Sequence, residues 1–116
     1  MAKKPKMPAG KVQDLAGLVS YSKASIVSRT LVENRAGTVT LFAFDKGEGL
    51  SEHTAPFDAL VQVIDGRAEI RIAGEPRQVK EGELLIMPAN LSHALKALTP
   101  FKMLLTMIRA ADVRKK

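Results

Sequence analysis

The chain holds only two histidines, and each lies in an element that combines a glycine corner with an apolar segment. His53 follows Gly47 and Gly49, and His93 follows Gly82. Neutral imidazole is the commonest metal ligand that proteins use. Two imidazoles and one carboxylate form the ligand set of non-haem iron(II) sites, and the same set holds Mn, Ni or Zn. The chemistry of the chain therefore depends on whether the fold brings His53 and His93 together.

The segments around the histidines have the composition of β-strands. Residues 67–72 alternate strictly, so Ala68, Ile70 and Ile72 should face the core while the charged residues between them face water. Other segments are rich in β-branched and aromatic side chains. We expect strands at 25–33, 38–45, 58–64, 67–73, 84–87 and 101–108. With shorter strands between them, roughly eight or nine in all, this spacing predicts an all-β sandwich or barrel.

Two segments outside the predicted strands also carry structural signals. Asp65-Gly66 lies between two apolar runs, which is the strongest short-range signal for a hairpin. We therefore predict that 58–64 and 67–73 pair as a β-hairpin. Residues 12–19, before the first strand, predict one turn of helix or an arm.

The net charge of +6 resides at the two ends of the chain. Residues 1–11 carry four lysines, residues 111–116 carry three basic side chains against one acid, and residues 12–110 carry eleven of each sign. Nucleic-acid-binding domains carry a basic face on the folded body, often with stacking aromatics. We therefore expect disordered basic tails at 1–11 and 111–116, one folded domain at 12–110, and no nucleic-acid partner.

Length and composition limit the class of protein. A chain of 116 residues forms one domain. No apolar run approaches the length of a membrane-spanning helix, and no apolar stretch follows the basic N-terminus as a secretory signal requires. The absence of cysteine excludes disulfides and thiolate metal sites. We expect a cytoplasmic protein with no membrane partner.

Two motifs resemble those of the cupin superfamily. The stretch from Gly47 through His53 to Gly66 resembles the first cupin motif, and the stretch from Gly82 through Pro88 to His93 resembles the second. The 15 residues between them match the short spacing of small microbial cupins. The resemblance covers about residues 38–108. It implies a double-stranded β-helix, or jelly-roll barrel, and a homodimer.

The resemblance also implies a ligand set, which this chain matches in part. His53 matches the first histidine of the family's set and His93 the last. Ala55 stands where a second histidine is expected, and Asp58 stands at the glutamate position. Aspartate is one methylene shorter, about 1.5 Å of reach, whereas metal bonds tolerate errors of about 0.2 Å. Two outcomes stay open: one divalent ion (Fe, Mn, Ni or Zn) on His53, Asp58 and His93, or a pocket without metal.

Three functions follow from these outcomes. In the first, the barrel binds a small polar or carboxylate-bearing molecule in a pocket lined by His53, Ala55, Phe57, Met87 and His93. In the second, the chain is a metal-dependent enzyme of the dioxygenase or isomerase type that uses Asp58 as its third ligand. In the third, it is a non-catalytic stress or regulatory module.

Methionines occur in two of the predicted strands. Met87, Met103 and Met107 have adaptable, polarizable side chains. We expect them to line a core or an apolar pocket in preference to binding a soft metal ion.

Overall fold

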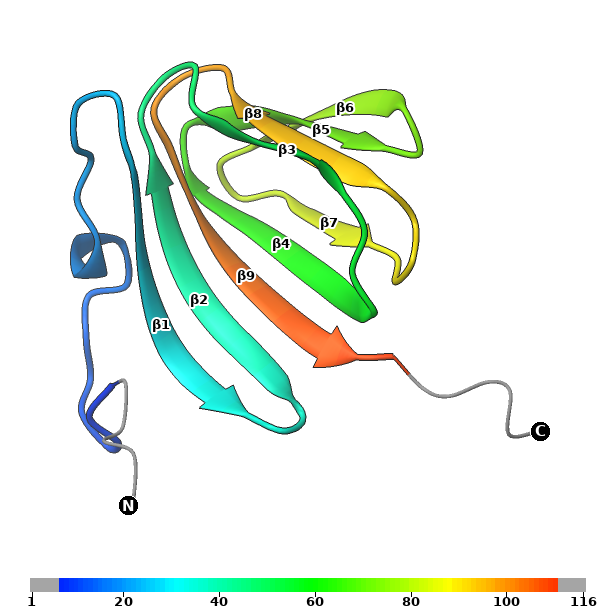
Figure 1. Cartoon of the computed structure of the whole chain (residues 1–116). Helices are drawn as coiled ribbons and strands as arrows, with labels where there is room; N and C mark the ends of the chain where they lie inside the picture. Colours follow the sequence, from blue (N-terminus) through cyan, green and yellow to red (C-terminus); the bar gives the residue numbers. More distant parts are fainter. Residues whose placement is uncertain (1–6, 111–116) are drawn as a thin grey trace.

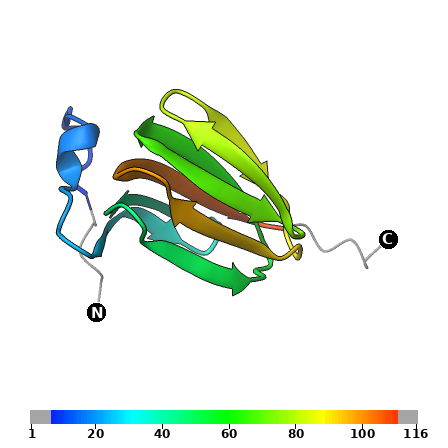
Figure 2. The same cartoon turned by 90° about the horizontal axis from the view of Figure 1, so that it is seen from above.

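Two antiparallel sheets face each other in the computed structural model, which describes residues 7–110 (Figures 1 and 2). The five-stranded sheet has the order β1-β2-β9-β4-β7, and the four-stranded sheet has the order β3-β8-β5-β6. The prediction of an all-β jelly-roll fold is confirmed. The strands of the described region are β1 (Ile26–Asn34), β2 (Gly37–Phe44), β3 (Gly49–His53), β4 (Phe57–Asp65), β5 (Arg67–Ile72), β6 (Glu75–Lys80), β7 (Leu84–Met87), β8 (His93–Ala97) and β9 (Phe101–Arg109).

The core fills the space between the two sheets. Alternate residues of each strand point inward, as the period of two requires. Phe44 of β2 stacks on Phe101 of β9 with ring centroids 4.7 Å apart, and both side chains are fully buried. In β5 the expected alternation is confirmed, since Ala68 and Ile70 are buried and Arg67 is exposed. Burial of these side chains is the main favourable term that holds the sheets together.

The predicted hairpin at Asp65-Gly66 is wrong. β4 pairs with β7 and β9 in one sheet, whereas β5 pairs with β6 and β8 in the other. The chain therefore crosses between the sheets at this corner. Gly66 has a φ of +73°, and a Cβ there would lie 2.0 Å from the carbonyl oxygen of Pro100. The glycine allows this close approach to the loop before β9, and strands distant in sequence determine the pairing.

The segment before β1 packs on the outer face of the five-stranded sheet (Figure 1). It contains one turn of 3₁₀ helix, Ala16–Leu18, within the region where one turn or an arm was predicted. Val19 is buried against β2. The Tyr21 hydroxyl donates a hydrogen bond of 2.5 Å to Asp65, and Lys102 Nζ lies 5.1 Å from the centre of the Tyr21 ring. These contacts attach the segment to the sheet.

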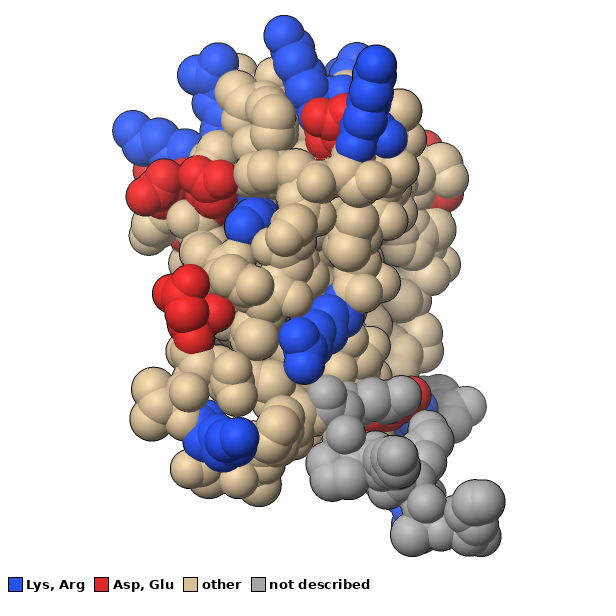
Figure 3. All heavy atoms as spheres, turned by 90° about the vertical axis from the view of Figure 1, so that its left-hand side faces the viewer, with Lys and Arg blue, Asp and Glu red and all other residues tan. Residues whose placement is uncertain are grey.

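The predicted basic tails fall mostly outside the described residues, since 1–6 and 111–116 are not described. The domain limits at 12 and 110 stay predictions. On the side seen in Figure 3, basic side chains gather at the upper edge, with acidic side chains beside and below them. No helix in residues 7–110 is long and apolar enough to cross a membrane.

Candidate functional site

The two histidines lie opposite each other on neighbouring strands. β3 and β8 are antiparallel, and His53 is the direct partner of His93 in their ladder. The ring centroids are 4.4 Å apart, and the ring planes cross at 71°. Residues 40 positions apart in the sequence thus form one pair of imidazoles.

An irregularity in β3 turns the side chain of His53 toward His93. Leu50 pairs with Leu95, and His53 pairs with His93, so three steps along β3 match two steps along β8. Side chains alternate along a regular strand, which would place Leu50 and His53 on opposite faces. The extra residue of the bulge breaks this alternation. Both side chains consequently line the same cavity between the sheets.

The two rings differ in their surroundings. The side chain of His93 is buried, with 7% of its surface exposed, whereas His53 is exposed at the mouth of the cavity. Burial, and next the charge of a protonated His53, lower the pKa of His93 below its ordinary 6.5, against a smaller opposing effect of its hydrogen bond to Leu91. His93 is therefore neutral at pH 7. The ring of His93 therefore lies inside the barrel, whereas the ring of His53 lies at its mouth.

Backbone carbonyls determine which nitrogen of each ring is available. His53 Nδ1 lies 2.7 Å from the carbonyl oxygen of Ser51, and His93 Nδ1 lies 3.2 Å from that of Leu91. A carbonyl oxygen only accepts, so each Nδ1 carries the hydrogen and donates it. In a neutral ring held in this way, Nε2 keeps its lone pair. This arrangement is the one found in metal-binding histidines, where the second nitrogen is held by a carbonyl or carboxylate.

The cavity beside the histidines is small and mainly apolar. Its volume is about 60 Å³. All five residues predicted for the pocket lie on its wall, although their role in binding stays a prediction. The wall is formed by Leu50, His53, Ala55, Phe57, Ala59, Met87, His93, Ala94, Leu95, Met103, Leu105 and Met107.

The residues predicted for the pocket included none from β9, although Met103 and Met107 of this strand were expected to line a core or an apolar pocket, as they do. Met103, Leu105 and Met107 point inward from this strand and close one side of the cavity. Their alternation with Lys102, Leu104 and Thr106 was a usable signal, because it marks one face of the strand as inward. What the sequence did not show is that β9 lies beside β4, opposite the histidine-bearing strands.

Asp58 does not join the histidines, and its predicted place as third ligand is corrected. Phe57 and Ala59 line the cavity, so the residue between them points to the opposite face of β4. Asp58 is exposed, and its carboxylate accepts a hydrogen bond of 3.0 Å from the backbone N–H of Ala89. Within the described part of the chain, no three His, Cys, Asp or Glu residues are grouped to hold a metal ion. The pocket thus offers two imidazoles and no carboxylate, which does not fit the family's divalent site.

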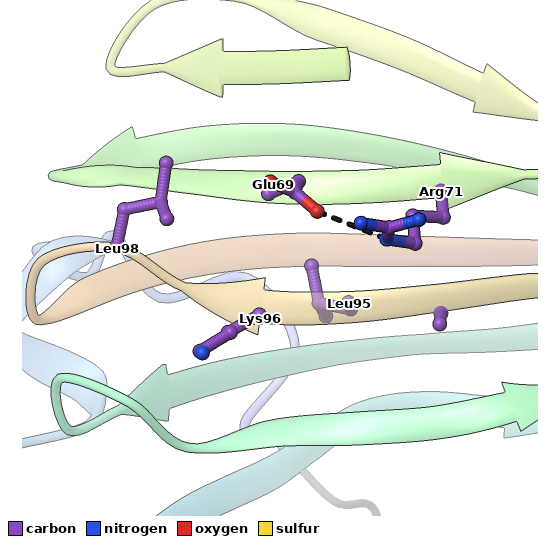
Figure 4. A pocket seen from close by; sticks show the side chains of 6 residues that line it. Glu69, Arg71, Leu95, Lys96 and Leu98 are labelled. Carbon is purple, nitrogen blue, oxygen red and sulfur yellow. Dashed lines mark hydrogen bonds and ion pairs between the residues drawn. The ribbon is translucent and has the colours of Figure 1, made fainter. Parts of the chain in front are cut away.

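A larger hollow lies on the outer face of the four-stranded sheet (Figure 4). It has a volume of about 320 Å³ and is lined by Glu69 and Arg71 of β5 and by Lys96 of β8, among others. Arg71 Nε lies 3.0 Å from Glu69 Oε2, and 53% of the arginine side chain is exposed. Exposed ion pairs of this kind contribute little to the free energy of folding. This hollow is open to solvent and contains neither histidine, whereas the histidine cavity brings both imidazoles together and is the candidate site.

Comparison with known proteins agrees with this geometry. A family model described as a cupin domain matches residues 40–108. A structure of a conserved protein of unknown function from Streptococcus pyogenes is 37% identical over 97% of this chain and 98% of that one, with a TM-score of 0.88. A cupin 2 conserved barrel domain protein from Leptotrichia buccalis is 43% identical over 82% of this chain and 46% of that one, with a TM-score of 0.80.

A cupin superfamily protein from Desulfitobacterium hafniense is 26% identical over 94% of this chain and 100% of that one, with a TM-score of 0.85. A comparison with curated proteins finds no match. The family model spans more than half of the 116 residues, and the relative from S. pyogenes aligns along almost the whole chain. This chain therefore belongs to the cupin superfamily.

Proposed function

We propose that this chain is a binding protein whose barrel cavity takes a small ligand beside His53 and His93. The observation that carries the proposal is the pair of imidazoles, 4.4 Å apart, beside an apolar cavity. Each ring has one nitrogen held by a backbone carbonyl and one lone pair free. A concave apolar site with a few convergent polar groups is the usual form of a ligand site.

The free lone pairs restrict what the ligand can present. An Nε2 atom that keeps its lone pair accepts a hydrogen bond or binds a cation, and it repels the lone pairs of a carboxylate. The pKa of His93 is lowered, so neutrality of this ring extends below pH 7. The ligand should therefore carry a hydroxyl, an amide N–H or a positive charge. A carboxylate-bearing ligand, one of the two kinds expected from the sequence, is disfavoured.

The volume restricts the size of the ligand. Sites for drug-sized molecules have volumes of about 300–1,000 Å³, against about 60 Å³ here. The cavity has room for a group of only a few non-hydrogen atoms. The exposed ring of His53 at the mouth leaves a path for entry.

The rival functions have less support. A metal-dependent dioxygenase or isomerase using His53, Asp58 and His93 requires a carboxylate in the cavity, and Asp58 faces the other side of β4. A non-catalytic stress or regulatory module needs no pocket at all. No contact in the described residues favours such a role over ligand binding.

A titration of the full chain, followed by the methyl resonances of the pocket methionines, tests the proposal. At pH 7.5 we expect saturable shifts with 1-propanol and propionamide and none with propionate. His93→Leu should abolish the shifts, whereas Arg71→Ala, on the outer hollow, should leave them unchanged. Equal binding of propionate, or binding that survives His93→Leu, would contradict the proposed role of the histidines.

A further inference from the structure

The outer face of the four-stranded sheet is uncovered and mainly basic. Figure 2 looks onto this face, and no other described element lies over it. In β5 the buried side chains of Ala68 and Ile70 point inward. Arg67, Glu69 and Arg71 alternate with them and therefore point outward.

Strand pairing adds two lysines to this face. Side chains that are directly opposite in an antiparallel ladder lie on the same side of the sheet. Lys80 of β6 is opposite Arg67, and Lys96 of β8 is opposite Glu69. Four exposed side chains, which we call the basic face, thus lie around one acid: Arg67, Arg71, Lys80 and Lys96.

The fold therefore separates charges that the sequence balances. Residues 12–110 carry eleven basic and eleven acidic side chains, yet Glu69 is the one acid among the outward residues of β5, β6 and β8. The basic side chains at the upper edge of Figure 3 lie on the side where Figure 1 places this sheet. The net charge of the chain consequently understates the field over this face.

Most of this charge has no partner among the described residues. Arg71 Nε lies 3.0 Å from Glu69 Oε2, whereas Arg67, Lys80 and Lys96 form no ion pair with a described residue. Arg67 and Lys80 are direct partners, and like charges in that position destabilise a sheet. A carboxylate bound between them would remove this repulsion.

The outer hollow gives the basic face a place for a partner's side chain. Its volume is about 320 Å³, and Arg71 and Lys96 both line it. Ala94 is directly opposite Arg71, so only a methyl group fills this position on β8. Figure 4 shows Arg71 and Glu69 joined on β5, with Lys96 on the neighbouring strand. An arginine fork binds a carboxylate through two parallel hydrogen bonds.

The composition of this face selects one class of anionic partner. Single-stranded nucleic acids are held by aromatic side chains that stack on the bases, and no outward residue of β5, β6 or β8 is aromatic. Phosphate chains and anionic lipid surfaces present continuous negative charge, which Glu69 in the middle of the face would repel. In an acidic polypeptide, an uncharged residue between two carboxylates can lie over Glu69.

We propose that the basic face docks an acidic segment of another protein. Guanidinium and ammonium groups of the four basic residues hold its carboxylates, and one of its side chains enters the outer hollow. This surface is separate from the proposed ligand site, since none of the four residues lines the histidine cavity.

Fluorescence anisotropy of the full chain with a labelled peptide of alternating glutamate and serine tests the proposal. We expect saturable binding at low ionic strength that weakens at least 10-fold near physiological salt, because salt screens exposed charges. The triple variant Arg67→Gln, Lys80→Gln, Lys96→Gln should weaken binding at least 10-fold. Glutamine keeps these exposed side chains long and polar, so the fold should persist, which thermal melting checks.

A second triple variant provides the matched control. Lys23→Gln, Arg29→Gln and Arg35→Gln remove the same charge from exposed positions before and within the β1–β2 hairpin, and they should weaken binding less than threefold. Both variants keep the basic residues at the two ends of the chain. Equal effects of the two triple variants would therefore overturn the basic face as the docking surface.

The remaining outcomes concern the partner and the other site. Tighter binding of oligothymidylate or of phosphatidylglycerol vesicles than of the peptide, lost in the first triple variant, would overturn the choice of an acidic protein segment. Shifts with 1-propanol should be the same in both triple variants. Their loss in the first variant would contradict the separation of the two sites.

Discussion

The corner between the two sheets at Gly66 gives the sharpest test of the fold. Gly66→Ala adds one methyl group to a residue with a φ of +73°. The new Cβ would lie 2.0 Å from the carbonyl oxygen of Pro100 and 2.9 Å from Cβ of Phe101. Contacts below 3.0 Å are essentially never formed by real Cβ atoms, so the corner or the loop must move.

Two costs add at this position. A left-handed backbone costs a residue with a Cβ about 1–2 kcal/mol. Forcing a methyl group into a packed region costs roughly 1–3 kcal/mol more. We therefore expect Gly66→Ala to lower the free energy of unfolding by about 2–5 kcal/mol, a large part of the stability of a small domain.

Gly82→Ala is the matched control. Gly82 has a φ of +86°, and a Cβ added there would meet nothing within 4 Å, so only the backbone cost of about 1–2 kcal/mol applies. Urea unfolding of both variants, followed by circular dichroism, measures the difference. Asparagine tolerates the left-handed region better than alanine does. Gly82→Asn should therefore be more stable than Gly82→Ala, whereas Gly66→Asn should be no more stable than Gly66→Ala, because its Cβ meets the same carbonyl oxygen. Equal losses at Gly66 and Gly82 would refute the argument from close approach.

Three further predictions concern other parts of the molecule. Tyr21→Phe should lower the free energy of unfolding by about 1–2 kcal/mol. Burial and the hydrogen bond to Asp65 raise the pKa of Tyr21 above its ordinary 10. The stabilisation by Tyr21 is therefore complete below pH 10 and is lost as pH rises through the raised pKa, which thermal melting at a series of pH values measures. Because the pKa of His93 is lowered, the unfolding free energy should fall as pH drops below 6.5, and His93→Leu should flatten this acid limb of the melting profile. The homodimer stays a prediction. Leu84 and Ile86 are each 57% exposed and lie on the outer face of the five-stranded sheet, where a second copy could cover them. Changing both residues to lysine should therefore convert a dimer to a monomer in light scattering, and a dimer that persists would exclude this face as the interface.

Local patterns in the sequence determined the strands and the pair of motifs. The alternation in 67–72 is a property of neighbouring residues, since successive side chains of a strand point to opposite faces. It therefore predicted the buried and exposed sides of β5 correctly. The glycine corners likewise marked two elements with one histidine each. Their resemblance to cupin motifs then implied that His53 and His93 would meet, which the β3–β8 ladder confirms.

Contacts between distant segments decided the rest. Asp65-Gly66 has the local signal of a hairpin, but the partners of β4 and β5 lie elsewhere in the chain, so the pair became a corner between sheets. Asp58 has the right place in the motif, but the alternation of β4 turns it outward. The bulge in β3 and the methionines of β9 became parts of one site only through strand pairing. Composition and spacing record which groups are available, whereas register and sheet packing determine which of them share a cavity.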